Sequence, residues 1–149
     1  MRSFLKTNSS HPHFIELVKL LDADLAERDG ADHSFYAQFN KINMIQHVIV
    51  AYEGDVPVAC GAFKFFEDAC VEIKRMYVLP QHRNKGIAAE VLQALELWAK
   101  DEGNKATVLE TGLKQPEAIR LYEKNGYTRI PNYGQYAGVE NSVCMKKDI

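Results

Sequence analysis

The sequence predicts a mixed α+β fold, in which helices cover both faces of one sheet. Two early helical segments precede a run of β-strands joined by short turns, and the last third alternates between strand and helix. Short turns join antiparallel strands, whereas a strand–helix–strand unit makes its two strands parallel. We therefore expect a mixed, mostly antiparallel sheet. No repeat or linker interrupts the pattern, so we expect residues 1–149 to form a single domain.

The first elements are a short strand over residues 4–7 and an amphipathic helix that ends near Asp29. Residues 8–10 (Asn-Ser-Ser) are typical helix caps, and apolar residues recur at helical spacing after them. A second, weaker helical segment is predicted around residues 35–39.

The middle of the chain is rich in β-forming residues. Residues 46–53 and 56–66 are two such runs, and the Gly-Asp pair at 54–55 between them is typical of a hairpin turn. A third strand is predicted over residues 70–79, and this part of the sheet is expected to be antiparallel.

The last third alternates between helix and strand. Apolar spacing predicts a helix from Ile87 that ends at Gly103, followed by a strand over residues 105–111. Pro116 suits the first turn of another helix, which should end at Asn125. The last two strands are predicted over residues 127–130 and 142–146.

Composition excludes several classes of protein. The net charge is −2, which disfavours non-specific binding of nucleic acid. Cys60, Cys70 and Cys144 are odd in number and lack metal-site spacing, so we expect reduced thiols, no disulfide framework and no metal. No apolar run approaches the roughly 18 residues that span a bilayer, and the N-terminus lacks the apolar core of a secretion signal. A cytoplasmic protein without a membrane partner is expected.

Residues 71–88 carry the most chemical information. They read as a strand bearing Glu72, a basic turn with Arg83 and Gly86, and the start of a long helix. Converging backbone N–H groups at such a turn, together with the helix dipole, can hold phosphate groups. Taken alone, the turn is equally compatible with a purely structural role.

Two motifs in the chain resemble those of the GNAT (GCN5-related N-acetyltransferase) superfamily, in particular its small bacterial single-domain members. Residues 83–88 match its motif Q/R-x-x-G-x-G/A. Its second motif, N-x-x-A-x-x-x-Y-x-x-x-G-F/Y, is matched by Ala118, Tyr122, Gly126 and Tyr127. Gln115 stands where the family usually has Asn, which weakens a helix cap or shifts a hydrogen bond to the cofactor.

The resemblance implies the GNAT fold, with acetyl-CoA bound where two parallel central strands splay apart. Pantetheine would pair with the main chain of the strand before the basic turn, and pyrophosphate with the N–H groups of the turn. The implied cofactor-binding residues are Met76, Tyr77, Val78, Arg83, Asn84, Lys85, Gly86, Ile87, Ala88, Gln115, Ala118 and Tyr122.

The resemblance also implies direct attack of an amine on the thioester, which needs a base and a proton donor for the leaving thiolate. Glu72 stands where the histone-acetylating branch has its general base; the alternative is a strand-end carboxylate paired with Lys74, Arg75 or another cation. Tyr122 matches the family's thiol-side tyrosine, although a tyrosine on an apolar helix face can also be core.

The acceptor side is less well defined. Glu110 and Thr111 end the second cleft strand, and Glu110 is a candidate second base, an ammonium ligand or a helix cap. Tyr133 and Tyr136 lie in a loop expected to line the acceptor side, or to be an ordinary connection.

We therefore expect an acetyl-CoA-dependent N-acetyltransferase that acts on a primary amine, more readily of a small molecule than of a protein. The alternatives are a non-catalytic acyl-CoA-sensing module and an enzyme that acetylates protein N-termini or lysines. A monomer or a homodimer is compatible with the sequence, which leaves the acceptor open.

Overall fold

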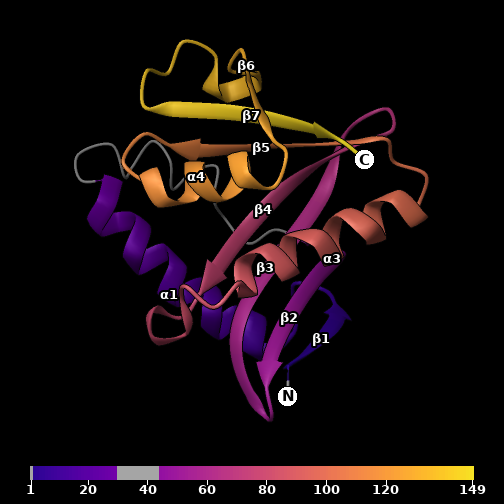
Figure 1. Cartoon of the computed structure of the whole chain (residues 1–149), viewed down its shortest axis with the longest axis vertical. Helices are drawn as coiled ribbons and strands as arrows, with labels where there is room; N and C mark the ends of the chain where they lie inside the picture. The colour runs from indigo at the N-terminus through magenta and orange to yellow at the C-terminus, as the bar shows by residue number, and fades with distance from the viewer. Residues whose placement is uncertain (1, 30–43) are drawn as a thin grey trace.

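Seven strands form one mixed sheet in the computed structural model, which describes residues 2–29 and 44–149 (Figure 1). Their order across the sheet is β1-β2-β3-β4-β5-β7-β6, and β4 and β5 are the parallel pair. The bounds are β1 Arg2–Thr7, β2 His47–Glu53, β3 Val56–Glu67, β4 Cys70–Val78, β5 Ala106–Gly112, β6 Thr128–Ile130 and β7 Ser142–Asp148. The predicted mixed, mostly antiparallel sheet is confirmed.

Helices cover both faces of this sheet, as predicted. They are α1 Pro12–Asp29, α3 Ile87–Asp101 and α4 Pro116–Lys124, with 3-10 turns at Pro80–His82 and Gly134–Tyr136. Alternation along β2 explains the two layers: Val48 and Val50 pack in the cluster with α1, whereas Ile49 and Ala51 pack in the cluster with α3 and α4. The helix predicted around residues 35–39 lies outside the described residues. Within them, no helix is long and apolar enough to cross a membrane.

The central strands β4 and β5 separate along their length. They pair only from Cys70↔Ala106 to Glu72↔Val108, although β4 continues to Val78 and β5 to Gly112. Figure 1 shows β4 running away from β5 at an angle, with α4 beside β5. The predicted splay is confirmed, and it leaves backbone groups of both strands without their usual ladder partners.

A β-bulge bends β4 inside this splayed part. Cys60 pairs with Tyr77 and Ala62 with Lys74, so two residues of β4, Arg75 and Met76, lie opposite Gly61. Arg75 has φ +59°, in the left-handed region that a non-glycine residue rarely adopts. The bulge re-aims the side chain of Arg75, which then forms an ion pair with Asp22 of α1.

Candidate active site

Two connected hollows follow the splayed strands. The first, which we call the charged pocket, has a volume of about 120 Å³ and takes its charged lining from Lys74, Arg75 and Glu110. The second, the long cleft, has a volume of about 510 Å³ and runs from β4 past the start of α3 to the length of α4. The residues that line both are Leu21, Met76, Gln115, Ala118 and Tyr122.

The long cleft brings together eleven of the twelve residues predicted to bind a cofactor. Lys85 is the exception: it is exposed and is not among the described residues that line the cleft. Four basic residues that line the cleft are absent from the cofactor-binding residues predicted from the sequence: Arg28, His82, Arg120 and Lys124. Arg120 and Lys124 stand four residues apart on α4 and therefore share a helix face. This spacing in the sequence could have identified them as a basic face of the helix.

The basic turn contains two residues in the left-handed region of backbone conformation. Gly86 has φ +80° and Asn84 φ +63°, immediately before the first residue of α3. A Cβ placed on Gly86 would meet no protein atom within 4 Å, so the backbone angle, rather than packing, requires glycine there. Arg83 donates from Nε to the carbonyl of Val78 at 2.9 Å, and this bond fixes its side chain on the turn.

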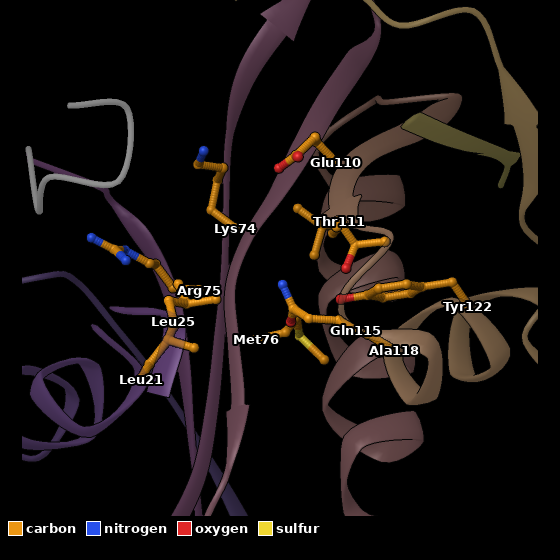
Figure 2. A pocket seen from close by; sticks show the side chains of 12 residues that line it. Leu21, Leu25, Lys74, Arg75, Met76, Glu110, Thr111, Gln115, Ala118 and Tyr122 are labelled. Carbon is orange, nitrogen blue, oxygen red and sulfur yellow. The ribbon is translucent and has the colours of Figure 1, made fainter. Parts of the chain in front are cut away.

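The charged pocket is walled by α1, β4, β5 and α4. Figure 2 shows the Glu110 carboxylate pointing from β5 toward β4, with the Lys74 amine on the other side of the gap and Arg75 extending toward α1. Burial lowers the pKa of Lys74, and the charges of Glu72 and Glu110 only partly oppose this. Leu21 and Leu25 add apolar surface from α1.

Tyr122 lies at the junction of the two hollows. Its ring is buried against Tyr127, and in Figure 2 its hydroxyl points into the gap between the strands, close to Gln115. Burial, and then the charge of Glu110, raise the pKa of Tyr122 well above its usual value. The phenol is therefore protonated at neutral pH and can donate a hydrogen bond or a proton.

Glu72 sits where β4 and β5 make their last register pair, below the splayed part. Its buried carboxylate accepts a hydrogen bond from the Tyr133 hydroxyl at 2.7 Å and has Lys64 Nζ at 3.9 Å. It is not among the described residues that line either hollow. The cation beside it is thus Lys64, which falls under the third alternative from the sequence, a cation other than Lys74 or Arg75.

The residues predicted for the acceptor side separate into two groups. Glu110 and Thr111 line the charged pocket. Tyr133 and Tyr136 are outside the described lining: Tyr133 holds Glu72, and Tyr136 is fully buried against Cys144. Within the described residues, no group of three His, Cys, Asp or Glu side chains is arranged to hold a metal.

Known proteins share this sequence pattern and this fold. Residues 14–127 match the acetyltransferase (GNAT) family. An IAA acetyltransferase of Azospirillum brasilense is 30% identical over 138 residues, covering 91% of this chain and 90% of its own. The uncharacterized N-acetyltransferase YsnE of Bacillus subtilis is 36% identical over 101 residues, or 66% of this chain and 67% of its own.

Solved structures agree with the family match. A Klebsiella pneumoniae protein named as an acyl-CoA N-acyltransferase superposes with a TM-score of 0.82 at 29% identity, over 99% of this chain and 97% of its own. The PaiA N-acetyltransferase of Thermoplasma acidophilum, solved with coenzyme A, has a TM-score of 0.72 at 15% identity over 100% and 99%, and shares the fold. This chain belongs to the acetyltransferase (GNAT) family and is a GNAT-type N-acetyltransferase.

Proposed function

We propose that this enzyme transfers the acetyl group of acetyl-CoA directly to the primary amine of a small molecule. One observation carries the proposal: the long cleft and the charged pocket meet at Tyr122, which lines both. A cofactor lying in the cleft would bring its thioester to this junction. An amine in the charged pocket would then face the thioester from the other side.

The residues of the long cleft fit such a cofactor. Beyond Glu72, the backbone of β4 is no longer paired with β5, so amides of a pantetheine arm can take the place of a neighbouring strand. The turn at Gly86 offers N–H groups at the start of α3, and Arg120 and Lys124 add positive charge along α4. When bound, acetyl-CoA supplies the activated acyl group.

Two side chains are suited to the proton transfers. Tyr122 keeps its proton at neutral pH and can give it to the departing sulfur. The position of Glu110 in the charged pocket favours it over Glu72 as the group that accepts the proton of the attacking amine. Glu72, which is held by Tyr133 and is not among the described residues of the pocket lining, would then position this end of β4.

The size of the charged pocket favours a small acceptor. Its volume of about 120 Å³ suits a small molecule, and an acetyltransferase named for IAA among the relatives supports this class. We also propose a cytoplasmic location, which three free and buried cysteines support because reduced thiols persist there.

The test measures thiol release from acetyl-CoA over a panel of small primary amines, with the acetylated product identified by mass spectrometry. We expect turnover that Glu110→Gln lowers by about 100-fold, the usual order for loss of a general base. Calorimetry with CoA shows whether the variant still binds the cofactor. Tight CoA binding with no product from any amine would overturn the proposal and favour a sensing module.

A further inference from the structure

Arg75 is a buried cation with one unsatisfied arm. Its side chain is only 3% exposed, and Nη1 donates to Asp22 Oδ1 at 2.8 Å. Nη2 is also buried, yet it has no hydrogen-bond partner among the described residues. A buried charged N–H group without an acceptor is costly, and native proteins rarely retain one without a reason.

The backbone makes the same position unusual. Arg75 adopts φ +59° inside the bulge of β4, a conformation that costs a non-glycine residue energy and persists mainly at functional sites. Pairing with Asp22 alone does not explain this arrangement. Asp22 is 47% exposed, so a surface arginine could reach it without burial and without the bulge.

The charges that line the pocket indicate which kind of ligand would accept a hydrogen bond from Arg75 Nη2. Two cations, Lys74 and Arg75, share the lining with the carboxylate of Glu110, and Asp22, outside the described lining, pairs with Nη1 of Arg75 and leaves Nη2 free to bond a second anion. An acceptor that carries only a positive charge would bring a third cation to the two already there. An acceptor that carries both an amine and a carboxylate gives each charged wall an opposite partner.

We propose that the charged pocket binds an amine acceptor that also bears a carboxylate, in its simplest form an amino acid with an apolar side chain. The carboxylate would accept from Arg75 Nη2 at the α1 side of the pocket, and the amine would face Glu110 on β5 (Figure 2). Leu21, Leu25 and Met76 provide the apolar surface between them. This inference rests on the proposed acetyl transfer and names its substrate class.

The test compares acceptors that differ only in the carboxylate. Leucine is paired with 3-methylbutylamine, and methionine with 3-(methylthio)propylamine, at saturating acetyl-CoA. We expect kcat/KM to favour each amino acid by about tenfold or more, the order for a hydrogen bond to a charged group. In Arg75→Gln, this ratio should fall about tenfold below its wild-type value, chiefly through a higher KM for the amino acid. The same two amines are compared in both proteins, so their different basicities cancel.

Controls separate binding from folding. Arg129 is exposed on β6, so Arg129→Gln should keep the wild-type ratio. The Tm and the CoA affinity of Arg75→Gln report whether the variant is folded. Should it not fold, 4-methylpentanoate is tested on the wild-type enzyme as an inhibitor competitive with the amine. The matched alcohol, 4-methylpentan-1-ol, should inhibit about tenfold less well.

The outcomes distinguish the two proposals. Acetylation of both members of each pair with equal kcat/KM, or an unchanged ratio in a folded Arg75→Gln, would refute the carboxylate subsite and leave acetyl transfer intact. Absence of any acetylated product would refute both.

Discussion

At the scale of single residues, Tyr122 lies where the long cleft and the charged pocket meet and lines both of them. We expect Tyr122→Phe to lower kcat by about 100-fold, because the ring stays in place while the proton donor is lost. Steady-state kinetics with a fixed amine measure this change. Tyr127→Phe is the matched control, since the Tyr127 hydroxyl bonds to Thr107 and Glu96 in the core, and Tyr127 is not among the described residues that line either hollow. It should lower Tm and leave kcat near the wild-type value; equal kinetic losses in both variants would contradict the role of Tyr122.

Glu72 and Glu110 are told apart by where their carboxylates lie. Glu110 lines the charged pocket, whereas Glu72 is buried outside its described lining and held by Tyr133. We therefore expect Glu110→Gln to lower kcat/KM by about 100-fold and Glu72→Gln to lower it much less. Tyr133→Phe should destabilise the fold by about 1–3 kcal/mol, because it leaves a buried carboxylate oxygen without its donor. Kinetics and urea denaturation measure both effects, and the reverse order of the two kinetic losses would make Glu72 the base.

At the scale of elements, the turn before α3 can be tested with a matched pair of glycines. Gly86 and Gly103 have φ +80° and +91°, and a Cβ on either would meet no protein atom within 4 Å. Each change to alanine should therefore cost a similar free energy, about 1–2 kcal/mol for the left-handed backbone. Gly86 lines the long cleft and Gly103 lies beyond the other end of α3. Only Gly86→Ala should weaken CoA binding in calorimetry; equal affinities in the two variants would exclude the turn from the cofactor site.

Most elements could be predicted from the sequence, but the bulge of β4 could not. Capping residues, the Gly-Asp turn and Pro116 mark element ends by local chemistry, and these ends agree with the structure to within one or two residues. Nothing in the local pattern of EIKRMYV shows that Arg75 takes a positive φ. That conformation depends on pairing with β3, where Gly61 leaves room opposite Met76. It is therefore a property of the assembled sheet.

At the scale of the whole molecule, the two halves of the site differ in how predictable they were. Most residues of the long cleft lie in or beside two contiguous motifs, so the resemblance to the GNAT family could name eleven of them. The charged pocket combines Leu21, Arg75 and Glu110 from three distant segments, which only the tertiary fold brings together. The bond between Tyr133 and Glu72 joins residues 61 positions apart and was missed for the same reason.

The interior of the molecule contains several weak acids that the fold keeps neutral. Burial raises the pKa of the Cys60 thiol from 9.0 to about 12. Burial likewise raises the pKa of four phenols, those of Tyr122, Tyr127, Tyr133 and Tyr136. In the unfolded chain this thiol and these phenols have ordinary pKa values. The folded and unfolded states therefore hold the same number of protons on these five groups below about pH 8, and different numbers above it.

These raised pKa values predict that the protein loses stability in alkali. Above about pH 9 the unfolded chain releases protons that the folded protein retains, so the free energy of unfolding falls as pH rises. Cys60 alone contributes a slope of at most about 1.4 kcal/mol per pH unit between its unfolded pKa and about 12. Urea denaturation from pH 7 to 11 measures the slope, and Cys60→Ala should reduce it while lowering stability equally at pH 7 and 8. A slope that is the same in both proteins would mean that this thiol ionises in the folded state, and hence that its strand is open to water.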